Sequence, residues 1–510
     1  MDQNNGGIIG KINTPTTTVA SGVWSLDSQF ESQSGSTWPL AFPQVTLANA
    51  CRFNAASSDS LTRTFGTPTN NKIWTYSFWM KHCDNAGVLL NTGADTSYMY
   101  FRGSSANPVP FGFSVEQYVS SFQYKLIPNE VFRDHSAWQH IVIAFDTTQS
   151  TASNRVKIYK NGSQITSFNS EDYPSQNLDT QVNSAVAHKI GGFASSGFYD
   201  GYLAEVVFID GQQLAPTSFG EFDEDSPNIW KPIDVSGLTF GNNGFYLDFE
   251  DSSALGNDKS GNDNDFTANN LSATNQSEDT CTNNYAIMNP ALPLFSSDFR
   301  NGAVEWRTTT NSQYYWANST IGVSQGKWYI EAKLQTAADH NYFGISADQP
   351  DDNTTFLAGG GGAGGANDLY EWGWKSSDGK IYNNTDGGTS YGSTYTSGDI
   401  LGMYLDLDNN KLYFAKNGTI QNSGTGISIT DPASTPNGVY FIAVGDGTSS
   451  NSCIWEVGFG NPSYGVSSAN TDPNGYGTFE YSPNDGGSSS FDSAAKDFYA
   501  LNTKNLAEFG

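Results

Sequence analysis

Apolar and polar residues alternate over short segments in much of the chain. In the segment 73–81, IWTYSFWMK, every second residue is large and apolar: Trp74, Tyr76, Phe78 and Met80. A period of two is that of a β-strand with one buried face. Similar runs, rich in β-branched and aromatic residues and separated by Gly, Asn and Asp, fill most of the sequence. The pattern predicts an all-β protein made of sandwiches or barrels.

Turn residues place hairpins between some of these strands. KNG at 160–162 predicts a two-residue turn, because Asn-Gly accepts the positive φ of a type I′ turn. IDGQQ at 209–213 offers a second such turn. LDLDNNKLYF at 405–414 predicts two alternating strands around the Asp-Asn-Asn at 408–410.

The spacing of strand and turn signals divides the chain into five expected parts. They are a leader (1–45), a first sandwich (46–215), an extended connector with one strand (216–299), a second sandwich (300–465) and a tail (466–510). In the connector, Phe245, Leu247 and Phe249 alternate, so this strand is expected to pack against a sandwich. In the tail, a short helix capped by Ser490 or Asp492 is expected to run to about Leu501, with extended residues after it.

Charge and composition remove several classes of function. The 510 residues carry 24 Lys+Arg against 52 Asp+Glu, a net charge of −28, and no Lys/Arg run. Nucleic-acid binding needs a basic footprint and is not expected. Apolar stretches stay below the roughly 18–20 residues that span a bilayer, so membrane insertion is not expected. The N-terminal MDQNNGGIIGKIN lacks a signal-peptide layout, so Sec export is not expected.

The surface is nevertheless expected to be mostly neutral and polar. Only 15% of residues are charged, while Asn, Ser, Thr and Gly abound and aromatic residues reach 14%. This composition is typical of proteins that work outside cells. A virion protein, made in the host cytoplasm and exposed on the particle exterior, reconciles it with the missing export signal.

Two stretches resemble known β-sandwich families. The first is the laminin-G-like, concanavalin-type jelly roll, whose Trp-His strand, Asn-Gly hairpin and closing strand match Trp138, His140, Tyr159, Asn161, Gly162, Gly192, Gly201, Glu205 and Val206. The second is the SPRY family, whose markers are found in order at Trp328, Tyr329, Ile330, Glu331, Gly344, Gly398, Asp399, Gly402, Leu405–Asp408, Lys416–Gly418 and Gly458–Gly460. Each resemblance covers about a third of the chain.

The two domains in this order, after a GGIIGKINTP leader, resemble structural proteins of tailed bacteriophages, especially tail-fibre proteins of marine phages. The resemblance implies a virion protein that binds host surface glycans and contacts other virion proteins through its leader. The leader residues expected to attach are Ile8, Ile9, Val23, Trp24 and Phe30. A homo-oligomer, with a trimer favoured, is expected. A capsid-bound decoration or head-fibre protein and, less favoured, a carbohydrate-active enzyme are the alternatives.

Catalytic motifs are not found. The sequence has no HExxH pair and no clustered E-x-D-x-E strand. His140 is expected to be structural, as are the acidic residues Asp406, Asp408, Glu331 and Glu371. We therefore expect a protein that is not an enzyme.

Metal and thiol chemistry are weakly indicated. NDKSGNDND at 257–265 offers Asp258, Asp263 and Asp265 to Ca²⁺, but it lacks the glutamate of an EF-hand, and a polar turn is favoured. No other cofactor is indicated. Cys51, Cys83, Cys281 and Cys453 form no metal-type cluster and are expected to be buried free thiols, with a Cys51–Cys83 bridge left open.

Sugar contacts are expected on the second sandwich. Tyr382, Tyr391 and Tyr395 belong to a Tyr/Ser/Gly/Asn-rich segment that is typical of adaptable binding loops. Trp372 belongs to a strand on which Tyr370, Trp372 and Trp374 alternate. An aromatic ring suits the amphipathic face of a sugar. For this strand, core packing is the favoured alternative.

Overall fold

A computed structural model of the protein describes residues 45–83, 86–93, 95–102, 112–224, 226–291, 297–308, 315–347, 368–383, 387–447, 452–484, 491 and 497–510. The leader residues Ile8, Ile9, Val23, Trp24 and Phe30 lie outside this part. Leu47–Lys231 and Ser236–Gly510 belong to one compact unit, which holds two β-sandwiches. The protein is all-β, as the alternation predicts, with one short α-helix in the described part.

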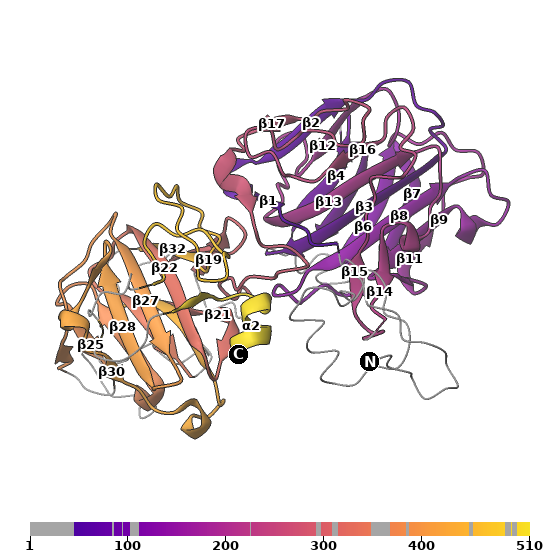
Figure 1. Cartoon of the computed structure of the whole chain (residues 1–510). Coiled ribbons are helices and arrows are strands. Elements are labelled where there is room, and N and C mark those ends of the chain that lie inside the picture. The colour runs from indigo at the N-terminus through magenta and orange to yellow at the C-terminus, as the bar shows by residue number, and fades with distance from the viewer. Residues whose placement is uncertain are drawn as a thin grey trace, which may run out of the picture. The chain divides into compact units, whose positions relative to one another are not determined.

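The first sandwich has two eight-stranded sheets (Figure 1). One has the order β10-β9-β8-β3-β13-β1-β18, with β16 paired to β13. Its strands are β1 (Ala50–Phe53), β3 (Ile73–His82), β8 (Gln139–Asp146), β9 (Val156–Lys160), β10 (Ser163–Gln164), β13 (Gly201–Asp210), β16 (Phe245–Leu247) and β18 (Gln276–Ser277). The other, in the order β11-β7-β6-β5-β4-β12-β2-β17, contains β2 (Ser60–Thr64), β4 (Gly87–Thr92), β5 (Ser97–Arg102), β6 (Gly112–Val119), β7 (Ser121–Pro128), β11 (Phe168–Asp172), β12 (Ala187–Ile190) and β17 (Thr267–Asn269).

The second sandwich has a nine-stranded and a six-stranded sheet. The larger has the order β19-β20-β32-β22-β27-β28-β29, with β30 on β28 and β33 on β22. Its strands are β19 (Ser297–Arg300), β20 (Glu305–Thr308), β22 (Lys327–Thr336), β27 (Ile400–Asp406), β28 (Lys411–Lys416), β29 (Thr419–Ile420), β30 (Ile427–Ser428), β32 (Ile454–Gly458) and β33 (Tyr499–Ala500). The smaller, in the order β21-β31-β23-β24-β25-β26, contains β21 (Tyr315–Val323), β23 (Asn341–Ser346), β24 (Glu371–Lys375), β25 (Lys380–Tyr382), β26 (Thr389–Ser390) and β31 (Tyr440–Asp446).

Two predicted hairpins are confirmed and one is wrong. Asn161 and Gly162 take φ of 46° and 78° between β9 and β10, as a type I′ turn requires. β27 and β28 pair across the turn at 408–410. After β13, however, the chain does not form a hairpin at Gly211. The Asp210 carboxylate accepts backbone N–H groups of other loops, and β13 pairs with β3, β1 and β16 instead.

The expected connector is not an extended linker with one strand. It contributes β14 (Gly220–Phe222), β15 (Trp230–Pro232), β16, β17 and β18. Phe245, Leu247 and Phe249 are buried in the first core, as their alternation predicts, and further along the same segment Leu255 and Phe266 join them. Strands of two or three residues carry too little periodicity to be recognised in the sequence.

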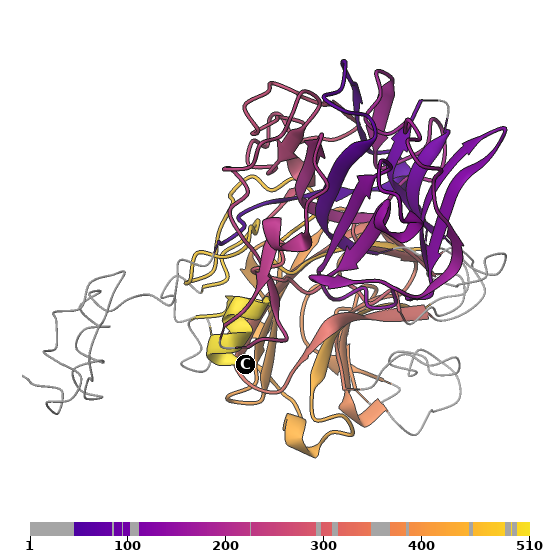
Figure 2. The ribbon, with the colours of Figure 1, turned by 90° about the vertical axis from the view of Figure 1, so that its right-hand side faces the viewer.

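The C-terminal helix is found later in the chain than predicted. Tyr499–Ala500 is strand β33, so a helix running to Leu501 is wrong, and residues expected to be extended form α2 (Thr503–Phe509; Figures 1 and 2). Asn502 caps this helix, because its side chain accepts the Asn505 N–H at 3.0 Å. The cap sets the start of the helix, and the caps expected from the sequence, Ser490 and Asp492, lie outside the described residues.

Candidate functional site

A pocket of about 360 Å³ opens on the second sandwich. Strands β24, β25 and β26 and the segment 422–427 form it, and its lining residues are Trp372, Ile381, Asn383, Thr389, Ser390, Tyr391, Asn422, Gly426 and Ile427. The lining combines aromatic and aliphatic surface with four neutral amide or hydroxyl side chains, and it contains no charged residue. Two of the four aromatic residues predicted to contact sugar, Trp372 and Tyr391, are therefore brought together.

Tyr391 is fixed before any ligand arrives. Its hydroxyl accepts the backbone N–H of Phe414 at 3.0 Å, and its ring meets Trp374 and Phe414 edge-on. Trp372 is 5% exposed and packs edge-on against Tyr440. A rigid aromatic wall loses little conformational entropy on binding, which favours affinity.

Tyr395 is not a surface contact. It is buried, and its hydroxyl lies 2.6 Å from the Trp374 carbonyl and 2.9 Å from that of Asn341. Burial raises the pKa of this phenol well above its ordinary value. The Tyr-rich loop composition did not reveal this burial, because a Tyr side chain can be buried when its hydroxyl finds a hydrogen-bond partner.

Tyr382 points away from the pocket. Its neighbour Ile381 lines the pocket, and alternate residues of a strand face opposite sides. Tyr382 packs instead in a small cluster with Trp316, Tyr342 and Ala443, and its hydroxyl donates to Asp378 at 2.7 Å. Desolvation, reinforced by the Asp378 carboxylate, raises the pKa of Tyr382 to about 12.

The pocket's other polar residues were not predicted from the sequence. Asn383, Thr389 and Ser390 flank the predicted tyrosines, but Asn422 comes from another loop, where it has a φ of 50°. Sequence spacing alone gives no signal that the 422–427 segment returns to this place. The alternation of Trp372 and Trp374 reflects core packing as well, since both are buried.

His140, which the sequence predicts to be structural, makes only contacts that hold the fold. His140 is buried, its Nε2 lies 2.8 Å from the Ser77 hydroxyl, and its Nδ1 accepts the Trp230 indole N–H at 2.9 Å. Burial lowers the pKa of His140 to about 3, so the ring is neutral. With Nδ1 already occupied, Nε2 carries the proton and donates to Ser77, which is the reverse of nucleophile activation.

The acidic residues singled out in the sequence accept hydrogen bonds that hold the fold together. Asp406 holds the β27–β28 turn by accepting from Asn409, and Asp408 accepts the Gly326 N–H. Glu331 is fully buried and accepts from Tyr329, Tyr464 and the N–H groups of Glu480 and Tyr481. Glu371 accepts from Ser346. Desolvation raises the pKa of Glu331 to about 7.

The acidic loop at 257–265 is organised by its own hydrogen bonds. Both oxygens of the buried Asp258 carboxylate accept from Tyr246, Ser260 and Asn264, while Asp265 accepts the Asp258 N–H. These contacts favour the polar-turn interpretation over a Ca²⁺ site. Within the described ranges, no group of three His, Cys, Asp or Glu residues could hold a metal ion. The four cysteines are free, so the possible Cys51–Cys83 bridge is not formed.

No helix in the part of the chain that the structure describes has the length and apolar character to cross a membrane.

Comparison with known proteins supports the resemblance of the second sandwich to the SPRY family. The SPRY domain family matches residues 327–454. Ran-binding protein 9 from Danio rerio is 30% identical over 115 residues, and the human protein of the same name is also 30% identical over 115 residues. The match covers 22% of this chain in both cases but only 17% and 14% of those proteins. The SPRY domain of human HERC1 is 15% identical, with 30% of this chain and 86% of that chain covered and a TM-score of 0.24.

Proposed function

We propose that this chain is a non-enzymatic attachment protein of a bacteriophage virion, of the tail-fibre or receptor-binding type, which binds host surface carbohydrate. The observation that carries the proposal is the Trp372–Tyr391 pocket. A sugar has apolar C–H faces and neutral hydroxyl edges, and this pocket pairs rigid aromatic surface with neutral amide and hydroxyl groups.

Other observations also support the proposal. SPRY domains are generally binding modules, and residues 327–454 match that family. The leader and the domain order, by their resemblance to phage tail fibres, support location on a virion and a trimeric state. The strong negative charge argues that adhesion to an anionic cell surface relies on stacking and hydrogen bonds rather than on steering.

A glycan array of bacterial surface polysaccharides tests the proposal. We expect retention of the wild-type protein on a subset of neutral glycans, with no release of new reducing ends. Retention with release would favour the carbohydrate-active enzyme, and no retention on any glycan would overturn the proposal. Cryo-electron microscopy of the intact particle separates a tail appendage from a capsid decoration, which the domain pairing alone does not distinguish.

A further inference from the structure

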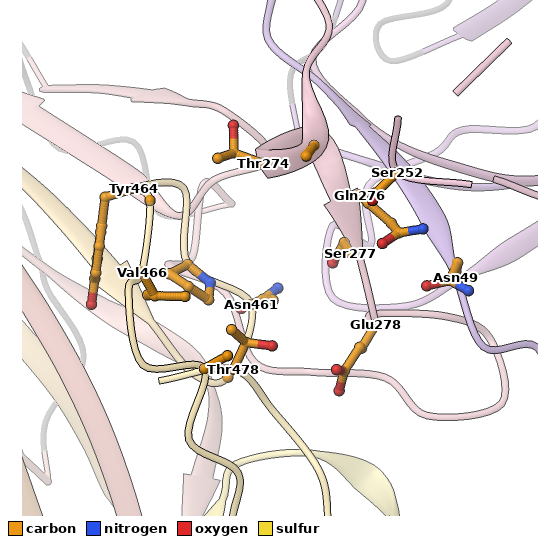
Figure 3. Close-up of a pocket in the computed structure, with 15 residues that line it drawn as sticks. Asn49, Ser252, Thr274, Gln276, Ser277, Glu278, Asn461, Tyr464, Val466 and Thr478 are labelled. Carbon is orange, nitrogen blue, oxygen red and sulfur yellow. The ribbon is translucent and has the colours of Figure 1, made fainter. Parts of the chain in front are cut away.

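A second pocket, of about 460 Å³, lies between two segments of the same compact unit that are far apart in sequence. One wall comes from residues 273–278 and Asn49, and the other comes from residues 460–478. Figure 3 shows Ser277 and Glu278 on one side, and Asn461, Val466 and Thr478 on the other. The pocket is within the range of small-molecule sites.

Asn461 is the main evidence that this pocket binds something. The residue is only 4% exposed, and its Oδ1 is buried without a hydrogen-bond partner in the described part of the protein. Its Nδ2 makes a long contact of 3.4 Å with the Tyr202 hydroxyl. Most buried side-chain polar atoms have at least one hydrogen-bond partner, so the unpaired Asn461 amide at a pocket wall marks a place where a ligand group would be accommodated.

The Asn461 amide also defines the kind of group that would satisfy it. Turning the amide by 180° exchanges Oδ1 and Nδ2 but leaves one of them unpaired. A hydroxyl can both donate and accept, so it fits in either orientation. The neighbouring backbone is held in place, because the buried Arg52 guanidinium donates to the carbonyls of Asn461, Thr274 and Pro462 at 2.7–2.8 Å.

Glu278 supplies a second fixed acceptor. Its Oε2 accepts the Tyr285 hydroxyl at 3.1 Å and the Gly477 N–H at 3.0 Å, which orients the carboxylate. In the described part of the chain Oε1 has no donor, so it can accept from a ligand hydroxyl. Glu278 is the one charged residue in the lining, which disfavours phosphate and carboxylate ligands.

The wall that carries Asn461 is otherwise largely apolar. Pro462, Tyr464, Val466 and Ala469 line it, and the Tyr464 ring is held by its hydroxyl contact with buried Glu331 at 3.4 Å. Polar groups on both walls, Glu278 on one and Asn461 on the other, together with the apolar surface beside Asn461, match the hydroxyl groups and C–H faces of a pyranose ring.

We propose that this pocket is a second saccharide site, which takes one neutral, hydroxylated sugar unit with hydroxyl groups on Asn461 and Glu278. The site is separate from the Trp372–Tyr391 pocket and does not rest on the function assigned to that pocket.

Saturation-transfer NMR with a mixture of the methyl pyranosides of glucose, galactose, mannose and N-acetylglucosamine tests this site. The measurement uses the Ser390→Trp variant, in which the first pocket is blocked. We expect saturation transfer to at least one glycoside, and an at least fivefold loss when Ser252→Trp is added, because Ser252 is a partly exposed residue at the second pocket. Adding Thr394→Trp, at an exposed position outside both pockets, is the matched control and should cause no loss.

Two further measurements test whether Glu278 binds the ligand and whether the site prefers a neutral sugar. Glu278→Gln should weaken the transfer, and glucose 6-phosphate should show less transfer than methyl glucoside. Absence of transfer in the Ser390→Trp protein, or equal transfer with and without Ser252→Trp, would overturn the second site. This result would not bear on the function proposed for the Trp372–Tyr391 pocket, because that pocket is tested in the wild-type protein. Thermal unfolding of each variant confirms that the fold is retained.

Discussion

Lys81 and Asp279 form an ion pair of 2.8 Å in which both side chains are completely buried. Lys81 Nζ also donates to the Asn284 side chain at 2.7 Å and to the Tyr285 carbonyl at 2.8 Å. Asp279 Oδ1 accepts from the Trp138 indole at 2.9 Å. The pair joins β3 of the first sandwich to the segment that leads into the second, and the surrounding hydrogen bonds satisfy both charges.

Removing one partner of this pair should destabilise the protein strongly. Lys81→Met leaves an unpaired buried carboxylate, and such changes cost about 3–5 kcal/mol in the free energy of unfolding. Urea denaturation measures the loss. The matched control is Lys72→Met, whose pair with Asp179 is exposed, so its cost should be about 1 kcal/mol or less. Equal costs for the two variants would contradict the role given to the buried pair.

Stability should depend on pH through Glu331. Burial raises the pKa of this carboxyl from 4.5 to about 7, so the folded protein binds a proton that the unfolded chain does not hold between these values. The Glu331 contribution is therefore fully present below about pH 4.5 and is lost as pH rises through 7. At about 1.36 kcal/mol per pKa unit, it amounts to as much as about 3 kcal/mol. Asp59, whose pKa burial raises to about 6, acts in the same direction.

Glu331→Gln isolates this contribution. The variant should be less stable than wild type, because the amide N–H₂ would face the N–H of Glu480 or Tyr481. Its free energy of unfolding should also change less between pH 5 and pH 8. Parallel pH profiles for the two proteins, measured by urea denaturation, would show that Glu331 does not titrate in this range.

Gly344 should tolerate no side chain. A Cβ at this position of β23 would lie 1.8 Å from the Trp372 carbonyl oxygen and 2.8 Å from Gly373 Cα. Gly344→Ala should therefore cost about 1–3 kcal/mol and displace the strand that carries Trp372. Gly387→Ala is the matched control, because a Cβ there meets nothing within 4 Å. A difference of less than about 0.5 kcal/mol between the two variants would contradict the close approach.

The cysteines should be unreactive in the folded protein. Cys51, Cys83 and Cys453 are buried, and burial raises the pKa of Cys51, Cys281 and Cys453 well above the ordinary value. A thiolate is required for attack on a disulfide reagent. We expect Ellman's reagent to titrate four thiols at pH 8 only after denaturation. Rapid reaction of any thiol in the native protein would be the contrary result.

Periodicity predicted the fold better than it predicted the site. Alternation in Trp74–Met80 and the Asn161-Gly162 turn act locally, so the strands and hairpin they predict are found. The two- and three-residue strands of the 216–299 segment depend on partners far along the chain, and no local signal marks them.

For the candidate site, the residue types pointed to aromatic contacts, but positions in the sequence did not show which aromatic residues line a pocket. Tyr391 lines a pocket, whereas Tyr395, four residues further on in the same Tyr/Ser/Gly-rich segment, is buried. Both tyrosines follow β26 outside any strand, so no period of two predicts where either side chain points. Asn461 and Glu278 lie 183 positions apart in the sequence, and only the folded chain brings them to one pocket.

The decisive measurement for carbohydrate recognition by the Trp372–Tyr391 pocket is the affinity for one neutral glycan selected on the array. It is measured for the wild type and for the Ser390→Trp and Thr394→Trp variants. Ser390 is an exposed residue of the lining, so a Trp there fills the pocket without disturbing the core, whereas Thr394 is exposed outside it. We predict that the dissociation constant rises at least tenfold for Ser390→Trp and is unchanged for Thr394→Trp. Equal affinity of all three proteins would contradict the account.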